Sequence, residues 1–187
     1  TLAGQAFGSY RHRFMPHTIT CHSHIAALNL ERKSYVGGRT ECFKLGKHIE
    51  ELYYIDVNSM YPNRHIGYFH RVTKAEVESW RDNYAVVVDV DLETDVANYP
   101  LVHEGRLCFP VGKFNVALAG PEFWRAWDDG AVKHINAASI YDQEEIFTPF
   151  VDYFYNKRLE AKHAGDEVTS YSYKILLNSL YGKFGQR

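Results

Sequence analysis

Two short segments, far apart in the chain, carry side chains whose types and spacing suit one kind of chemistry. The first is Asp56-Val-Asn-Ser-Met-Tyr-Pro62, and the second is Lys174-Ile-Leu-Leu-Asn-Ser-Leu-Tyr-Gly182. A carboxylate can bind Mg²⁺, which shares one or two protein carboxylates with substrate phosphates. A lysine can bind a triphosphate, and a tyrosine ring can contact a sugar. Together these groups indicate nucleotidyl transfer.

Asp56 follows the apolar residues Tyr53-Tyr54-Ile55, so we expect it at the end of a strand over 52–57. Taken alone, it could equally be an aspartate of a turn or a helix N-cap. Ser59 and Tyr61 at fixed offsets favour the functional interpretation. A ring at Tyr61 held under a nucleotide sugar would clash with a 2′-hydroxyl and select deoxynucleotides. The alternative for Tyr61 is a core aromatic.

Lys174, Asn178 and Tyr181 have the spacing i, i+4 and i+7, which places them on one face of a helix. A surface helix also offers such a face to water, and that is the alternative for Lys174. A second, apolar face is expected to hold Tyr173, Leu177, Leu180 and Phe184.

The preceding helix carries Arg158 and Lys162 four residues apart, with Lys157 beside them. Cations from two neighbouring helices could bind a triphosphate together. The alternative is a solvated face in which Glu160 is an ion-pair partner.

Two other groups of polar residues resemble metal sites less well. Asp89 and Asp91 are two apart on an expected strand and so share a face, but we favour a structural role for them. A Cys/His group does not have the two separated ligand pairs of a structural zinc site. Its members are His17, Cys21, His22 and His24.

Composition excludes several classes. The net charge of −2 argues against a chain that is basic throughout, although local basic patches remain compatible with it. Three cysteines without framework spacing argue against a disulfide scaffold. No apolar run approaches the roughly 18 residues of a membrane span, and no secretory signal is visible. The length suits one domain or two small ones.

The pattern along the chain predicts a mixed α and β fold. Paired glycines in Tyr35-Val-Gly37-Gly38 predict a turn, Pro62-Asn63 is expected to end an element, and 93–120 is expected to be rich in loops. We expect strands over 52–57, 84–92 and 137–141, and helices over 74–82, 121–129, 148–162 and 170–184.

The two segments resemble motifs A and B of the family-B DNA polymerases. Their residues are most similar to those of the protein-primed branch found in phages and linear plasmids. Tyr35-Val-Gly37-Gly38 resembles the Y-x-G-G element of that branch, which lies between the exonuclease and polymerase domains and contacts template DNA. Three motifs in the family's order, over residues 35–182, carry the resemblance.

The resemblance implies a role for each matching residue. Asp56 would be one of two catalytic ligands of the two Mg²⁺ ions in the intact enzyme, and Val57 would offer its backbone carbonyl to metal. Tyr35, Gly37 and Gly38 would contact DNA. The nucleotide would be bound by Ser59, Tyr61, Lys162, Lys174, Asn178 and Tyr181. Lys157 and Arg158 would add triphosphate or DNA contacts.

The resemblance also implies an α+β fold: a partial polymerase palm with an antiparallel sheet, and a helical fingers hairpin. Residues 1–50 would link the exonuclease and polymerase domains, 51–147 would form the palm with an insertion, and 148–187 would be fingers helices. The loop-rich region 93–150 would overlap the insertion that meets a terminal protein. Substrates would be a DNA primer-template and dNTPs. We expect location in the cytoplasm of a phage-infected host, or in mitochondria for a plasmid-encoded enzyme.

Two family features are absent from this sequence. They are the third motif, Y-x-D-T-D-S, which carries a second metal-binding aspartate, and the exonuclease motifs. We therefore expect the chain to be part of a larger enzyme and inactive alone. Two alternatives stay open: a catalytically inactive nucleic-acid-binding relative, and a small metal-dependent nuclease using Asp56, Asp89 and Asp91.

Overall fold

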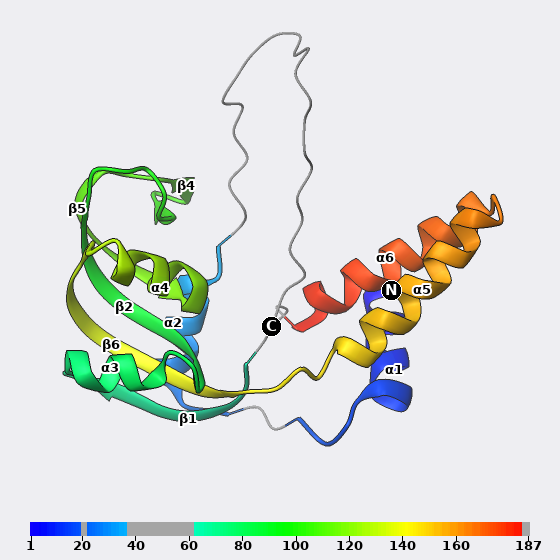
Figure 1. Ribbon diagram of the computed structural model, residues 1–187, viewed down its shortest axis with the longest axis horizontal. Coiled ribbons are helices and arrows are strands. Elements are labelled where there is room, and N and C mark those ends of the chain that lie inside the picture. The colour runs from blue at the N-terminus through cyan, green and yellow to red at the C-terminus, as the bar shows by residue number, and fades with distance from the viewer. Residues whose placement is uncertain (20–21, 37–61, 185–187) are drawn as a thin grey trace, which may run out of the picture. The chain divides into compact units, whose positions relative to one another are not determined.

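The computed structural model describes residues 1–19, 22–36 and 62–184. The chain divides into two compact units, one formed by Thr1–Ile19 with Glu145–Arg187 and the other by Thr20–Glu144. One unit is helical and the other is built on an antiparallel sheet (Figure 1). The α+β class expected from the sequence is therefore confirmed.

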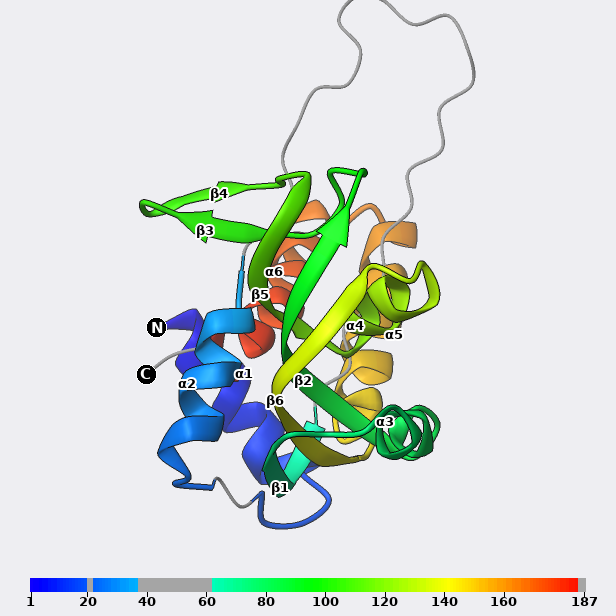
Figure 2. The same cartoon turned by 90° about the vertical axis from the view of Figure 1, so that its left-hand side faces the viewer.

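The sheet unit contains a four-stranded antiparallel sheet with the order β1-β6-β2-β5. A separate two-stranded hairpin, β3-β4, extends beside it (Figure 2). Among the described residues of this unit, three helices accompany the strands. In chain order the elements are α2 (Ile25–Ser34), β1 (Pro62–His70), α3 (Lys74–Trp80), β2 (Tyr84–Thr94), β3 (Leu101–His103), β4 (Arg106–Cys108), β5 (Gly112–Ala119), α4 (Gly120–Asp128) and β6 (Val132–Gln143).

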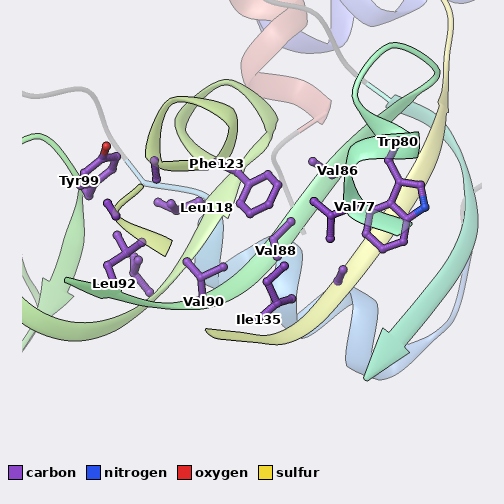
Figure 3. Packing of buried hydrophobic residues seen from close by; sticks show 14 of the residues in the cluster. Val77, Trp80, Val86, Val88, Val90, Leu92, Tyr99, Leu118, Phe123 and Ile135 are labelled. Carbon is purple, nitrogen blue, oxygen red and sulfur yellow. The ribbon is translucent and has the colours of Figure 1, made fainter. Parts of the chain in front are cut away.

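Alternation along β2 decides which helices cover which face of the sheet. Val86, Val88 and Val90 point to one face and are almost fully buried there. They pack with Phe123 of α4 and with residues of α3 (Figure 3). Val87 points to the opposite face, where it packs against Leu30 of α2. The sheet is therefore covered by α3 and α4 on one face and by α2 on the other.

The first turn of α3 is closed by a capping box. The Thr73 hydroxyl accepts from the backbone N–H of Glu76, and the Glu76 carboxylate accepts from the backbone N–H of Thr73 at 2.8 Å. Each side chain satisfies a backbone donor that the helix leaves unpaired. Sequence and structure therefore agree on where this helix begins.

The helical unit is held together by aromatic side chains. Its elements are α1 (Leu2–Ser9), a π-helical turn η1 (Tyr10–Phe14), α5 (Thr148–His163) and α6 (Glu167–Phe184). Tyr10 and Phe150 are fully buried, and Phe14 packs edge-on against Phe150 with ring centroids 5.5 Å apart. The Tyr10 hydroxyl donates to the Ile146 carbonyl. The N-terminal residues thus complete the core of the C-terminal helices, a grouping that the sequence pattern did not indicate.

Most predicted elements are confirmed, and two predictions about loops are wrong. The helices α3, α4, α5 and α6 and the strands β2 and β6 form where expected, with ends shifted by a few residues. Pro62-Asn63 was expected to end an element, but β1 begins there, because proline is tolerated at the first position of a strand. The predicted loop region 93–120 contains β5, which pairs along its whole length with β2. The predicted strand over 52–57 lies outside the described residues.

Acid is expected to destabilise the sheet unit through two carboxylates. Hydrogen bonds from Thr73 lower the pKa of Glu76, and the hydrogen bond from Arg125 lowers the pKa of Asp129. A carboxylate with a lowered folded-state pKa stabilises fully above its ordinary pKa of roughly 4, and this contribution is lost as the pH falls through the folded value. The unfolding temperature should therefore fall as the pH is lowered below about 5.

Thermal unfolding followed by circular dichroism across a pH series measures this effect. The double variant E76Q/D129N should have a lower unfolding temperature at neutral pH and a flatter dependence in the acid range. An equally steep acid dependence in that variant would assign the transition to other carboxylates.

Candidate nucleotide-binding face

The helices α5 and α6 form a hairpin with one apolar seam. They lie side by side (Figure 1), and Gly165 in the short connection adopts a φ of +74°, a conformation that favours glycine. The rings of Phe154 and Tyr173 lie 5.8 Å apart across the seam. Leu177 and Leu180 of α6 pack in the core that contains Phe150. The apolar face predicted for α6 is confirmed at these positions.

The predicted polar face of α6 faces solvent. Lys174 and Asn178 are exposed, four residues apart on the helix. Tyr181 belongs to the same helix, and its side chain lies outside the described part of the structure. Lys174 has no ion-pair or hydrogen-bond partner among the described residues. A fixed cation on a rigid helix, not neutralised by a neighbour, can receive an anionic ligand.

The three cations of α5 are not equivalent. The Lys157 ammonium lies 2.6 Å from the Glu160 carboxylate, and this hydrogen bond raises the pKa of Lys157. The ion pair with Glu160, which the sequence left open as the alternative for these cations, is therefore present at Lys157. Arg158 is half-buried and Lys162 is exposed, and neither has a partner among the described residues.

Helical spacing brings two of these cations to the side of Lys174. Each residue advances about 100° around a helix, so Arg158 and Lys162 lie on one flank of the seam of α5 and Lys157 lies on the other. On α6, Lys174 and Asn178 lie to one side of the apolar seam. Going around each helix axis in the direction of the chain, this is the same side of the seam as that of Arg158 and Lys162 on α5. When two helices pack antiparallel, residues on the same side of their seams lie on the same face of the pair. The hairpin therefore carries Arg158, Lys162, Lys174 and Asn178 on one face.

Several predicted site residues lie outside the described part of the chain, namely Gly37, Gly38, Asp56, Val57, Ser59 and Tyr61. Tyr35 is described. It follows the last residue of α2 with extended backbone angles, φ −80° and ψ 91°, and its side chain is 57% exposed. An exposed aromatic ring at a helix end is available for contact with a ligand.

Asp89 and Asp91 have protein partners, as the structural interpretation predicted. One oxygen of each carboxylate accepts from the side-chain amides of Asn115 and Asn136, and the second oxygen of Asp89 accepts from Lys33 at 2.7 Å. Both oxygens of Asp89 and one oxygen of Asp91 thus already accept hydrogen bonds from protein donors. Among the described residues, no group of three or more His, Cys, Asp and Glu side chains could hold a metal ion.

The histidines near the N-terminus support α2. His24 is the N-cap residue, and its ring nitrogen accepts from the backbone N–H of Ala27 at 3.2 Å. His22 lies 2.7 Å from the Glu31 carboxylate. The Tyr141 hydroxyl donates to the same carboxylate, and burial together with this bond raises the pKa of Tyr141. Cys21 lies outside the described residues, and zinc has no support from His22 or His24.

Lys33 is the residue with a defined structural role that the sequence did not single out. It joins α2 to Asp89 of β2 and to Asn115 of β5. These partners are 56 and 82 residues away in the chain. Only the pairing of the strands brings them together, so no local spacing signals the contact.

The whole chain, residues 1–187, matches the model of a protein family described as DNA polymerase type B, organellar and viral. It is 30% identical over 170 residues to a DNA-directed DNA polymerase of Enterobacteria phage PRD1, which covers 83% of this chain and 28% of that protein. It is 26% identical over 203 residues to a probable DNA polymerase of Ascobolus immersus, covering 99% of this chain and 16% of that protein.

The fold resembles part of a solved polymerase. The structure of Phi29 DNA polymerase complexed with primer-template DNA matches with a TM-score of 0.63 at 12% identity, covering 100% of this chain and 36% of the other. The chain thus spans between 16% and 28% of the length of the curated relatives it matches. Within its described residues, no helix is long and apolar enough to cross a membrane.

Proposed function

Because the chain belongs to the organellar and viral type B DNA polymerases, we propose that it supplies one catalytic aspartate and the nucleotide-binding face of a DNA-directed DNA polymerase. That enzyme adds dNTPs to a 3′-hydroxyl in DNA replication. The observation that carries the proposal is the α5–α6 hairpin, which buries its aromatic seam and leaves Lys174, Asn178 and Lys162 exposed. The test is primer extension by a full-length polymerase that contains this chain.

Each side of the nucleotide has a proposed partner. Lys174 and Lys162 bind the triphosphate, with Arg158 as a further contact, and Asn178 and Tyr181 line the nascent base pair. Ser59 supports the triphosphate, and the ring of Tyr61 lies under the sugar. An ammonium or guanidinium that lacks a protein carboxylate gains most from a phosphate. Lys157 contributes less, because Glu160 already pairs with it.

Two Mg²⁺ ions fit the chemistry of the donors that the motif offers. The Asp56 carboxylate and the Val57 carbonyl are hard oxygen donors, which Mg²⁺ prefers. The ions would neutralise charge on the phosphates during in-line displacement. The chain's own contribution is to supply these oxygens from one segment, and the cations Lys162 and Lys174 from the hairpin.

The proposed partners follow from the family. Tyr35, with Gly37 and Gly38, contacts the primer-template, and a terminal protein is the primer in the protein-primed branch. The enzyme then works in the cytoplasm of a phage-infected host or in mitochondria. The nuclease alternative loses support, because Asp89 and Asp91 accept from Asn115, Asn136 and Lys33. A catalytically inactive relative would bind primer-template without extending it.

Asp56→Asn in the full-length polymerase should abolish extension and leave DNA binding nearly unchanged. The amide has the size of the carboxylate but is a poor Mg²⁺ ligand. The loss of several kcal/mol of metal-assisted stabilisation corresponds to more than about a hundredfold in turnover. Single-turnover extension and primer-template affinity are measured together. Turnover within tenfold of the parent enzyme would make Asp56 a structural residue.

Lys174→Ala should lower kcat/KM for dNTP by about tenfold to a hundredfold, because a charge-assisted contact to the triphosphate is lost. Lys157→Ala is the matched control. It removes the same charge from the same hairpin, but from a lysine already paired with Glu160, and should change kcat/KM by less than about threefold. An unchanged dNTP response with weaker DNA binding in Lys174→Ala would assign Lys174 to the duplex backbone.

Tyr61→Val should increase ribonucleotide insertion relative to deoxynucleotide insertion, with a smaller effect on dNTP turnover. A rigid ring excludes a 2′-hydroxyl by steric contact, and valine leaves space for it. Discrimination is the ratio of two kcat/KM values, so both nucleotides are measured on one template. A ratio within about twofold of the parent enzyme, roughly 0.4 kcal/mol, would show that Tyr61 only packs in the core.

A further inference from the structure

The helix α2 has few apolar contacts to hold it on the sheet. Only Ala27 and Leu30 are buried, while Ile25 at its start is 74% exposed. Leu30 packs against Val87 and the other residues of a small cluster. Burying one leucine contributes about 1.5–3 kcal/mol and has no direction. Apolar burial therefore keeps α2 near the sheet but leaves its rotation and its position along the strands weakly determined.

Lys33, in the last turn of α2, makes a directional contact between the helix and the sheet. Its ammonium lies 2.7 Å from a carboxylate oxygen of Asp89 and 2.7 Å from the side-chain carbonyl of Asn115. Asp89 belongs to β2 and Asn115 to the neighbouring strand β5. One cation that bonds to two strands restrains both the rotation of the helix and its position along the sheet. We call Lys33, Asp89 and Asn115 the Lys33 anchor.

The acceptors of the anchor are held by the sheet itself. Asn115 lies opposite Asp91 in the β2–β5 ladder, and its amide donates to Asp89, to Asp91 and to the carbonyl of Val90. Asn136 is the extra residue of a β-bulge in β6, where Asp89 pairs with Ala137 and Val90 with Ile135. The bulge directs the Asn136 amide to both carboxylates. The Asp89 carboxylate is thus oriented by amides of two strands, β5 and β6. Its side chain is 19% exposed, and that of Lys33 is 45% exposed.

A second contact acts on the same turn of α2. Glu31 accepts from the Tyr141 hydroxyl of β6 and contacts His22. The Glu31 carbonyl accepts from the backbone N–H of Tyr35 at 3.0 Å. Tyr35 therefore follows a helix end that is bonded to the sheet at Glu31 and at Lys33. The ring of Tyr35 is exposed to solvent.

We propose that the Lys33 anchor positions Tyr35 for contact with template DNA, so that Lys33 acts on DNA affinity without touching DNA. The inference rests on the proposed function, in which the Tyr35-Val-Gly37-Gly38 element contacts the primer-template. Lys33 is a positioning residue. Its loss should weaken DNA binding and leave the dNTP site, on the α5–α6 hairpin, unaffected.

The experiment uses a full-length polymerase that contains this chain, with a fluorescent primer-template as the probe. K33M keeps the length of the side chain and removes the charge. It should raise the Kd for primer-template by about fivefold to tenfold, in the usual range of coupling between sites, with KM for dNTP within twofold of the parent. K33R keeps the charge and can reach both acceptors, so it should restore a Kd close to that of the parent.

K113M is the matched control. It removes one lysine charge from the same sheet unit by breaking the exposed pair of Lys113 and Glu93, whose charged atoms lie 3.6 Å apart. This pair joins β5 to β2, and its ion pair involves no residue of α2. K113M should leave the Kd within twofold of the parent. An equal loss of DNA affinity in K113M and K33M would show that the effect comes from the net charge of the protein, and would overturn the inference.

Y35A separates the two proposals. If Y35A weakens DNA binding and K33M does not, the anchor has no positioning role and the proposed function stands. If neither variant changes the Kd, the proposed DNA contact of the element is wrong. D89N tests the anchor if K33M does not fold. It keeps the volume of the side chain and the contact between Lys33 and Asn115, and removes the charge of the carboxylate. An unchanged Kd in folded D89N would also overturn the inference.

Discussion

The pairing of β1 with β6 is the constraint on which the arrangement of the sheet unit depends. It places Pro62 opposite Gln143, and so closes a loop of about 80 residues, at an entropic cost near 4 kcal/mol plus a constant. All the other described strands of the unit lie within this loop. Without the pairing, β1 would have no partner among the described strands, because β6 is its one neighbour in the sheet order.

The sheet unit is stable enough to offset the entropic cost of closing this loop, because β2 is buried on both faces. Valines at alternate positions pack under α3 and α4, and Val87 packs under α2. Each fully buried valine contributes roughly 1.5–3 kcal/mol relative to an exposed one, so a few of them offset the closure entropy. β6 then pairs on one side with β2 and on the other with β1. The core therefore determines the position of β6, and β6 in turn determines the position of β1 at the edge of the sheet.

Sequence patterns predicted the elements whose periodicity is local. The run Tyr84–Leu92 alternates and became β2, and the spacing of Leu177 and Leu180 identified the buried face of α6. β5 was missed because Gly112 and the nearby prolines indicate turns, while its strand conformation is imposed by pairing with β2. The polar face of Lys174 and Asn178 followed from helical spacing alone. The contact of Lys33 could not be predicted, because its partners Asp89 and Asn115 meet only after β2 and β5 have paired.

The pair Asp89 and Asp91 shows what separates a structural carboxylate from a metal ligand. Both lie on one face of a strand, as a two-metal site would require. The difference is made by their neighbours in the fold: an amide from the next strand, a second amide directed by a β-bulge, and an ammonium from the helix above. The two amides donate to one oxygen of each carboxylate, and the Lys33 ammonium offsets the charge of Asp89. A carboxylate pair in a sequence therefore indicates a metal only when the surrounding strands do not already supply its donors.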